Sequence, residues 1–320
     1  MILGIIEHDR GQLNNQSLEM LALARQVAAD EGVAGVTAVL IGSNSAPLAD
    51  HLARYGVSQA IVASHDGLDD YAPEAWAETV VQIAQAKSPK AIMATGTERG
   101  NELLAHIAAR LGQPMAANVT QVAVGNPYAI TRVRWGGSLF EEARLYGDIK
   151  LLTVAPLTQP IREAPVDSVT VETFTPQLDE KLFRVRVTSR EAPESDKISL
   201  AEARLVVGGG RGVGSAEGFA VLEELATLLG GAVGGSRVAT NLGWRPHADQ
   251  VGQTGTRIAP DLYIACGISG AIQHWVGCKG SKKILAINTD PEAPMMTKAD
   301  YAVVGDLHEI LPALIAELTR

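Results

Sequence analysis

Short apolar segments alternate with amphipathic ones along the first third of the chain. The predicted strands are Ile2 to Ile6, Thr37 to Ile41, Ala60 to Ala63 and Ala91 to Thr95. The predicted helices are Ser17 to Ala29, Pro47 to Tyr55, Pro73 to Lys87 and Glu98 to Leu111. The strand segments are continuously apolar, which is typical of strands covered on both faces. The alternation therefore predicts a parallel sheet with right-handed crossovers.

The pattern changes after Leu111. The next β-like segments are Val119 to Val124, Tyr128 to Arg134, Glu142 to Lys150 and, further on, Phe183 to Thr188. The first three are separated by too few residues for helical crossovers, so we expect antiparallel strands that extend the first sheet. Residues Arg190 to Asp196 are polar, contain a proline and show no periodicity. They predict a boundary between an N-terminal domain, residues 1–190, and a C-terminal domain, residues 191–320.

A second α/β alternation follows this boundary. Its predicted strands are Arg204 to Val207, Ala232 to Val233, Leu262 to Cys266, Ile284 to Ile287 and Ala302 to Val304. Its predicted helices are Glu217 to Leu229 and His308 to Leu318. The sequence thus predicts an α/β protein of two domains, each built on a mainly parallel sheet flanked by helices.

Composition narrows the function classes. Of 320 residues, 46% are hydrophobic and 4% aromatic, and the net charge is -9. Such a surface repels nucleic acid and offers few stacking rings, so small molecules and proteins are the expected partners. The two cysteines form no CxxC motif, no leader precedes the first strand, and no run reaches the roughly 18 apolar residues of a membrane span. We expect a soluble cytoplasmic protein, or a mature chain from which a leader has been removed.

A glycine-rich turn, Gly208 to Ser215, follows the first strand of the second domain and contains Arg211. Backbone N–H groups at such a strand-to-helix turn suit an anion, and arginine suits a phosphate. No frame of the turn fits the dinucleotide fingerprint GxGxxG. An ordinary βα turn with a surface arginine is an equally good interpretation.

Polar residues also follow the other strands of this domain. Ser236 and Arg237 come after the second strand, where an arginine is more often solvated than ligand-binding. In Gln250 to Gly255, two glycines bracket an amide and a hydroxyl that can face a flat ligand, although a polar surface turn explains them equally well.

The third strand runs into Cys266-Gly267-Ile268-Ser269-Gly270-Ala271-Ile272-Gln273-His274. We expect a helix to start near Ser269, which can cap it or bind a phosphate, and His274 to present an N–H to a ligand. A lone histidine is more often a satisfied, half-buried side chain. Asn288 and Asp306 follow the last two strands, where both are ordinary turn formers. Polar groups at five successive strand ends nevertheless predict a ligand crevice at the carboxyl edge of the sheet.

Metal and hydrolytic sites are disfavoured. The seven histidines show no HExxH spacing, the two cysteines lack partners for zinc, and the GxSxG nucleophile elbow is absent. A cofactor site without an evident acid, base or nucleophile indicates electron transfer more than bond cleavage.

The chain resembles the alpha subunit of electron transfer flavoproteins. The segments that carry the resemblance are Gly209 to Gly212, Ser236-Arg237, Gln250 to Gly255, Leu262 to His274, Ile284 to Asn288, Asp290 to Pro294 and Ala299 to Tyr301. A looser similarity extends upstream to Glu7-His8 and Gly100 to Leu104, so the resemblance covers essentially the whole chain.

The resemblance implies an FAD held mainly by the second domain. The positions that match the family's FAD-binding residues are Arg211, Ser236, Arg237, Val251, Gly252, Gln253, Thr254, Ser269, Gly270, Ala271, Ile272, Gln273, His274, Asn288, Asp306 and Leu307. It implies that Arg237 lies over the isoalloxazine ring, Thr254 near N5 and His274 near the C2 carbonyl oxygen. A cation and an N–H donor there favour the negative charge that reduction places on the ring.

The resemblance also implies partners. A beta subunit is the obligate partner and the first domain its platform; acyl-CoA or other flavin dehydrogenases are the expected donors, and a membrane quinone oxidoreductase the expected acceptor. The chain itself is then an electron carrier and not an enzyme. Two alternatives stay open: the alpha subunit of an electron-bifurcating, NADH-linked complex, and a nucleotide-binding scaffold or enzyme subunit without a redox role.

Overall fold

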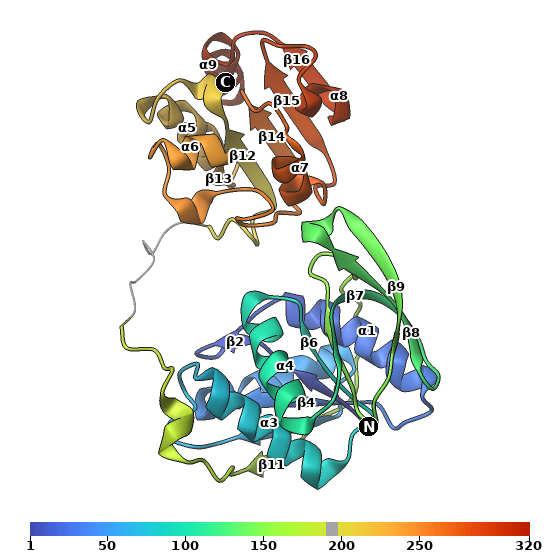
Figure 1. Cartoon of the computed structure of the whole chain (residues 1–320). Helices are drawn as coiled ribbons and strands as arrows, with labels where there is room; N and C mark the ends of the chain where they lie inside the picture. The colour runs from blue at the N-terminus through green and yellow to red at the C-terminus, as the bar shows by residue number, and fades with distance from the viewer. Residues whose placement is uncertain (190–197) are drawn as a thin grey trace. The chain divides into compact units, whose positions relative to one another are not determined.

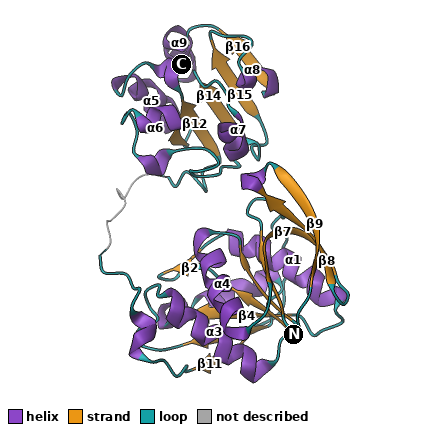
Figure 2. Ribbon diagram, in the orientation of Figure 1, coloured by secondary structure: helices purple, strands orange, loops and turns teal. Residues whose placement is uncertain are grey.

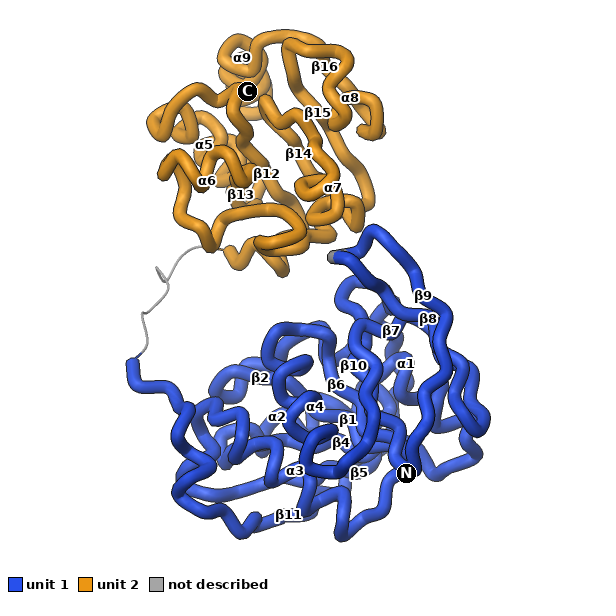
Figure 3. The backbone as a smooth tube through the Cα atoms, viewed as in Figure 1, with its two compact units in different colours: residues 1–190 blue, residues 191–320 orange. Residues whose placement is uncertain are grey.

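The computed structural model describes residues 1–189 and 198–320, and the chain divides into two compact units, Met1–Arg190 and Glu191–Arg320 (Figure 3). The predicted boundary segment, Arg190 to Asp196, lies outside the described residues. Both units are mixed α/β structures with mainly parallel sheets flanked by helices, which confirms the predicted fold class (Figure 2).

Unit 1 is built on a large sheet. Its strands are β1 (Ile2–Ile5), β4 (Val36–Ile41), β5 (Gln59–Ala63), β6 (Ala91–Thr95), β7 (Met115–Ala123), β8 (Tyr128–Arg134), β9 (Leu139–Leu145), β10 (Lys150–Val154) and β11 (Thr170–Phe174). Within the described residues these nine strands lie in the order β11-β5-β4-β1-β6-β10-β7-β8-β9. All neighbouring strands are parallel except β8, which runs antiparallel to β7 and β9. A separate small hairpin joins β2 (His8–Asp9) and β3 (Gln12–Leu13).

Helices cover both faces of this sheet (Figure 1). They are α1 (Gln16–Asp30), α2 (Leu48–Leu52), α3 (Pro73–Lys87) and α4 (Glu98–Leu111), with short 3-10 helices at Ser43–Ser45, Ala53–Tyr55, Trp135–Gly137 and Glu180–Phe183. The buried faces of α1 and α2 pack on one side of the sheet, and those of α3 and α4 on the other. The strands are therefore covered on both faces, as their continuous apolar sequences predicted.

Local signals fix the ends of the two long helices on the α3–α4 face. Pro73 occupies the first turn of α3, where its missing N–H has no helical partner to lose. The Thr97 hydroxyl caps α4 by accepting the Gly100 N–H at 2.9 Å, and Gly112, at φ 62°, ends this helix. These signals explain why α3 begins, and why α4 begins and ends, where the sequence predicted.

The segment Glu142 to Lys150, predicted as one strand, is divided between two. A turn at Gly147, with φ 106°, follows the end of β9, and the chain re-enters the sheet at Lys150 as β10. Strand β10 lies between β6 and β7 and is parallel to both. The prediction was wrong because apolar residues continue on both sides of the turn, so the sequence pattern does not show the break.

The predicted strand Phe183 to Thr188 is also absent from the described residues of this region. Phe183 instead ends a 3-10 helix, and its ring stacks on His65 with centroids 5.9 Å apart. The edge strand is β11, whose residues are largely exposed and therefore lack an apolar pattern. An edge strand is held by backbone hydrogen bonds to one neighbour, so its sequence carries a weak signal.

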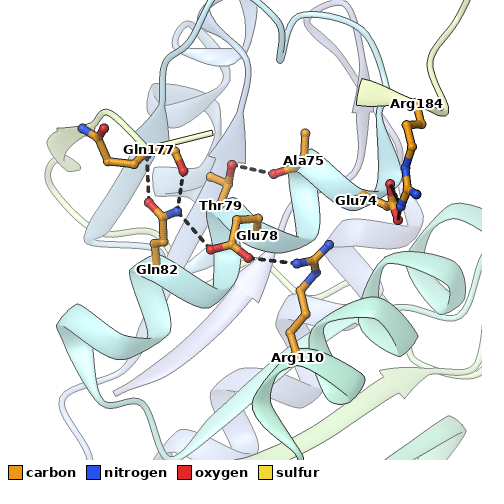
Figure 4. Close-up of polar contacts among 8 residues, drawn as sticks. All are labelled: Glu74, Ala75, Glu78, Thr79, Gln82, Arg110, Gln177 and Arg184. Atoms are coloured by element: carbon orange, nitrogen blue, oxygen red, sulfur yellow. Dashed lines mark hydrogen bonds and ion pairs between the residues drawn. The ribbon is translucent and has the colours of Figure 1, made fainter. Parts of the chain in front are cut away.

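Polar contacts bind the segment after β11 to helix α3 (Figure 4). The Gln82 side chain exchanges two hydrogen bonds with the backbone of Gln177, at 2.8 and 2.9 Å. Arg184 forms an ion pair with Glu74 at 2.8 Å. The backbone pairing by Gln82 replaces the strand contacts that this irregular segment lacks.

Unit 2 is a smaller doubly wound unit. Its strands are β12 (Leu205–Gly209), β13 (Ala232–Gly235), β14 (Leu262–Cys266), β15 (Ile284–Asn288) and β16 (Tyr301–Val304). Its helices are α5 (Ala220–Leu228), α6 (Arg237–Asn241), α7 (Ile272–Cys278), α8 (Pro294–Lys298) and α9 (Leu307–Leu318), with 3-10 helices at Arg211–Val213, Glu217–Phe219 and His247–Asp249. Among the described residues, the five strands are all parallel, in the order β13-β12-β14-β15-β16.

The two faces of this sheet have separate cores. Helices α5, α6 and α9 lie on one face and α7 and α8 on the other (Figure 1). Their buried residues form the two cores. Strand β12 comes first in the chain, β13 pairs with one of its edges and β14 with the other, so the direction of winding reverses between β12 and β14. Such a reversal leaves a crevice at the carboxyl ends of the two strands. Throughout the described chain, no helix is both long and apolar enough to cross a membrane.

Candidate cofactor-binding site

Two glycine turns meet at the carboxyl ends of β12 and β14. The Gly210 N–H donates to the Cys266 carbonyl at 2.9 Å, and the Gly212 N–H to the Gly267 carbonyl at 3.1 Å. A Cβ atom on Gly210 would lie 2.3 Å from the Gly267 carbonyl oxygen, well inside contact distance. Glycine is therefore required for the turns to approach, and the strand ends carry little side-chain bulk.

A cavity of about 580 Å³ opens beside these turns. Its lining residues are Arg211, Gly212, Ser236, Arg237, Val238, Asn241, Gly267, Ile268, Ser269, Gly270, Ala271, Gln273, His274, Asn288, Asp290 and Ala293. They follow β12, β13, β14 and β15, so four strand ends contribute to one crevice. The volume lies within the range of roughly 300–1,000 Å³ that is typical of small-molecule and cofactor sites.

Arg211 and Arg237 give this cavity a positive lining. Arg211 follows β12 and Arg237 is the first residue of α6, and both are exposed. Neither guanidinium pairs with a carboxylate of residues 1–189 or 198–320, although the chain as a whole carries a net charge of -9. Unpaired arginines in a concave site suit an anionic ligand such as a diphosphate, which they can bind through paired N–H groups.

Ser236 combines a structural and a lining position. Its hydroxyl accepts the Ala239 N–H at 3.3 Å and so caps α6, while its own N–H donates to the Gly209 carbonyl at 2.8 Å. The cap fixes the first turn of α6, and Arg237 is the first residue of that turn.

The segment Ser269 to Ala271 lines the cavity without being helical. Helix α7 begins at Ile272, so the predicted start near Ser269 was wrong. Gly270 adopts φ 80°, and a Cβ atom there would lie 2.4 Å from the Met295 nitrogen. The Ser269 carbonyl accepts the Met295 N–H at 3.0 Å, so this turn is held by the start of α8 and delays the helix. Ser269 therefore does not cap α7.

His274 lies in the first turn of α7 and is 7% exposed. Its Nε2 is 2.8 Å from the hydroxyl of Tyr263, and Nδ1 is buried without a hydrogen-bond partner among the described residues. Burial lowers the pKa of His274 to about 4, and the nearby Val251 backbone opposes this only in part. The ring is consequently neutral at pH 7 and keeps one unsatisfied nitrogen.

The loop Val251 to Thr254 lies against α7 and does not line the cavity. The Gln253 N–H donates to the Gln273 carbonyl at 2.8 Å. Gly252 touches Gly277, where a Cβ atom would lie 2.3 Å from the Gly252 Cα. The Thr254 hydroxyl accepts a hydrogen bond from Gln250 at 3.0 Å and is exposed. The structure thus places these four predicted residues next to the cavity-lining turn of α7, outside the cavity itself.

The other predicted residues divide into two groups. Asn288 lines the cavity, and its amide donates to the Ile268 carbonyl at 3.1 Å. Asp306 instead caps α9 by accepting the His308 N–H at 2.9 Å, and Leu307 is buried against Gly267. Ile272 is 64% exposed. The cavity therefore collects nine predicted residues: Arg211, Ser236, Arg237, Ser269, Gly270, Ala271, Gln273, His274 and Asn288.

Sequence reasoning did not select several lining residues. They are Gly212, Val238, Asn241, Gly267, Ile268, Asp290 and Ala293. Most lie within two positions of a predicted residue in the same turn, so a search of whole strand-end turns finds most of them. Asp290 has its own signal: its N–H donates to the Asn288 side chain at 3.1 Å, an Asx turn of the kind that follows strands.

The side chains of the two cysteines of unit 2 do not line this cavity. Cys266 and Cys278 are buried free thiols, and burial raises the pKa of each to about 12. Both therefore remain protonated and unreactive at pH 7. In residues 1–189 and 198–320, no three His, Cys, Asp or Glu side chains gather as a metal site.

Unit 1 has a comparable reversal between β1 and β6, and its own side chains fill it. Glu7 follows β1, and its carboxylate accepts hydrogen bonds from Thr95 at 2.8 Å, from Asn14 at 3.0 Å and from Thr97. His8 is buried, and its Nε2 lies 2.8 Å from the Ile41 carbonyl oxygen. The cavity left at this place is about 10 Å³, the size of one water.

Comparison with known proteins relates both units to one family. Residues 2–178 match the family model described as an electron transfer flavoprotein domain, and residues 199–279 match the electron transfer flavoprotein FAD-binding domain. The chain is 36% identical to the electron transfer flavoprotein subunit alpha of Thermoanaerobacterium thermosaccharolyticum, over 98% of this chain and 96% of the relative. It is 37% identical to the subunit alpha of Bacillus subtilis and 38% to the protein FixB of Clostridium saccharobutylicum, each over 97% of this chain and 94% of the relative.

Proposed function

This chain belongs to the electron transfer flavoprotein alpha-subunit family, and we propose that it carries electrons on a bound FAD as one half of a heterodimer. The observation that carries the proposal is the lining of the unit 2 cavity. Two arginines that have no carboxylate partner in residues 1–189 or 198–320, and a neutral histidine with one unpaired ring nitrogen in the same residues, line one crevice at a sheet reversal. An anionic dinucleotide with a polar ring offers partners for all three groups.

The lining residues fit FAD. We assign Arg211 to the diphosphate because it lies beside the glycine turns. Glycine has no side chain, so a phosphate can approach the backbone N–H groups of these turns closely. Arg237 and His274 are assigned to the flavin ring, where a cation and an N–H donor stabilise negative charge. FAD supplies the capacity to take up two electrons and release them singly. The chain's own residues bind, orient and electrostatically tune it.

A carrier role agrees better with this lining than hydrolysis does. His274 directs Nε2 to Tyr263 and not to a serine hydroxyl, and Ser236 uses its hydroxyl to cap α6. A nucleophile must be hydrogen-bonded to its base, or close to that arrangement, for acyl transfer. We therefore propose that the protein converts no substrate of its own.

The partners follow from the family. We propose that unit 1 is the platform for a beta subunit and that unit 2 holds the cofactor, in a cytoplasmic heterodimer. Acyl-CoA or other flavin dehydrogenases are the proposed donors, and a membrane quinone oxidoreductase is the proposed acceptor. The filled edge of the unit 1 sheet supports this division, because unit 1 keeps no room there for a nucleotide of its own.

Coexpression of the chain with its beta subunit tests the proposal. The expected product is a yellow heterodimer with FAD bound to the alpha subunit. Arg237→Ala should lower the potential at which the bound flavin takes up its first electron, because it removes the cation that stabilises the resulting charge. The matched control is Arg204→Ala, an exposed arginine of the same unit whose partner is Asp261 at 2.7 Å, and it should leave the potential unchanged.

Three results would contradict the proposal. A colourless complex that takes up no FAD removes the carrier role. NADH-dependent reduction with a second FAD per complex assigns the chain to an electron-bifurcating complex instead. A stable homo-oligomer that needs neither FAD nor a partner assigns it to a nucleotide-binding scaffold.

A further inference from the structure

A buried tyrosine contacts the cavity histidine from the side of the sheet. Tyr263 lies in β14 and is 0% exposed, and its hydroxyl is 2.8 Å from Nε2 of His274 in α7. The two rings lie 6.1 Å apart at an angle of 28°. Tyr263 is not among the positions that the resemblance implies for FAD binding, and it does not line the cavity.

A glycine makes this contact possible. Val206 of β12 pairs with Tyr263, so Gly208, two residues further on, lies on the same face of the sheet. A Cβ atom on Gly208 would lie 2.3 Å from the Tyr263 hydroxyl oxygen and 2.8 Å or less from two carbons of its ring. Any other residue at this position would displace the phenol. Gly208 therefore gives the hydroxyl access to Nε2 of His274.

The hydrogen atoms of this pair can be counted. In one arrangement, the Tyr263 hydroxyl donates to Nε2, and the single proton of the neutral ring is on Nδ1. In the other, Nε2 carries the proton and donates to the tyrosine oxygen. The hydroxyl hydrogen of Tyr263 is then buried without an acceptor in the described chain, and Nδ1 is also unpaired. The first arrangement leaves one buried group unsatisfied and the second leaves two.

We infer that Tyr263 is a positioning residue that fixes His274 in the tautomer with its proton on Nδ1. The hydroxyl of Tyr263 bonds to Nε2, so the remaining donor of the ring is Nδ1–H, which has no hydrogen-bond partner among the described residues. His274 lines the cavity, so we assign this donor to a ligand that binds there. The complementary ligand group is an uncharged or anionic oxygen acceptor, which the carbonyl oxygen of a flavin ring provides. This last step rests on the proposed function, whereas the tautomer itself does not.

The tautomer can be measured directly. Full-length chain labelled with ¹⁵N-histidine gives separate ¹⁵N chemical shifts for protonated and unprotonated ring nitrogens, and loss of signals in His274→Gln assigns those of His274. At pH 7 the wild-type chain should show a protonated Nδ1 and an unprotonated Nε2. Tyr263→Phe removes only the hydroxyl and should move the proton toward Nε2. Tyr301→Phe, which removes an exposed hydroxyl from β16, should leave the shifts unchanged.

The heterodimer tests the consequence for the ligand. Tyr263→Phe should weaken FAD binding roughly two- to tenfold, as expected for one misdirected hydrogen bond, and lower the potential of the first electron. Tyr301→Phe should change neither quantity. A purely structural role for Tyr263 would change stability without a tautomer shift.

Each contrary result has its own meaning. A wild-type His274 with its proton on Nε2, or a Tyr263→Phe chain with the wild-type tautomer, overturns the inference. A shifted tautomer with unchanged affinity and potential overturns the role of Nδ1 in ligand binding. A wild-type heterodimer that binds no FAD refutes the proposed function, while the ¹⁵N measurement on the chain alone still decides the role of Tyr263.

Discussion

At the carboxyl edge of its sheet, unit 1 is filled where unit 2 is open. At the carboxyl ends of β1 and β6, the Glu7 carboxylate accepts hydrogen bonds from Thr95, Thr97 and Asn14. The cavity left there has a volume of about 10 Å³. At the carboxyl ends of β12 and β14, glycine turns leave a cavity of about 580 Å³. Both places are reversals of strand order, so topology alone does not decide which one is open.

The difference lies in how the polar groups are satisfied. At the sheet edge of unit 1, the Glu7 carboxylate and its hydrogen-bond donors all belong to unit 1 and pair with one another. In unit 2, Arg211, Arg237 and Nδ1 of His274 have no partner among the described residues. Groups left unpaired in a concave site reduce the stability of the free protein and favour a ligand that pairs with them. The same strand-order reversal is therefore filled in unit 1 by side chains that pair with one another, and it holds a cavity in unit 2 because glycines occupy the turns.

The largest effect should come from adding bulk to the open edge. Gly267→Ala places a Cβ atom 2.7 Å from the Gly212 Cα at a residue with φ 62°. Backbone strain of about 1–2 kcal/mol and overpacking of about 1–3 kcal/mol should together reduce the free energy of unfolding of unit 2 by about 2–5 kcal/mol. Urea denaturation of the full-length chain measures this loss.

Gly230→Ala is the matched control for that substitution. Gly230 has φ 65°, yet a Cβ atom there meets no described atom within 4 Å. Only the strain of about 1–2 kcal/mol should remain. Equal losses in the two variants would show that the contact between the glycine turns contributes nothing to stability.

The stability of unit 2 should depend on pH because His274 is buried in its neutral form. Burial lowers the pKa of His274 from 6.5 to about 4, so below pH 6.5 the unfolded chain binds a proton that the folded chain does not. Stability from this residue is complete above pH 6.5 and is lost as the pH falls from 6.5 toward 4, by about 3 kcal/mol. In urea titrations without FAD, the free energies of unfolding of wild type and His274→Gln should converge by this amount between pH 7.5 and 4. Parallel curves would mean that His274 titrates normally.

A smaller loss of stability is expected when the Glu7 carboxylate is removed from the sheet edge of unit 1. Glu7→Ala removes the acceptor of Thr95, Thr97 and Asn14 and should cost unit 1 about 2 kcal/mol, because polar groups lose their partner in a partly buried place. FAD binding by unit 2 should not change. Glu163→Ala, which removes an exposed carboxylate paired with Arg54, is the control and should have little effect on the unfolding curve. A loss of FAD binding in Glu7→Ala would break the assignment of the cofactor to unit 2.

Much of the fold was readable from the sequence because local signals agree with the tertiary structure. The helix Pro73–Lys87 and the strand Leu262–Cys266 have the predicted bounds. The two failures have different causes. Strand β10 was joined to the end of β9 across Gly147, and β11 was missed, because the first continues an apolar pattern through a turn and the second is an exposed edge strand.

The sequence by itself determined the strand-end position of the site and its chemical character. Glycines that must turn, an arginine after each of two strands and a histidine after a third are local facts, and parallel strands bring their ends together. Only the tertiary structure decided which of these residues share the cavity. It places Thr254 on the exposed side of a loop and Asp306 at the cap of a helix. It also places the Tyr263 hydroxyl against His274, which is possible because Gly208 has no side chain. The physical reason is that partners such as Gly208, Tyr263 and His274 come from three elements, and their distances are set by sheet register and packing that no local pattern encodes.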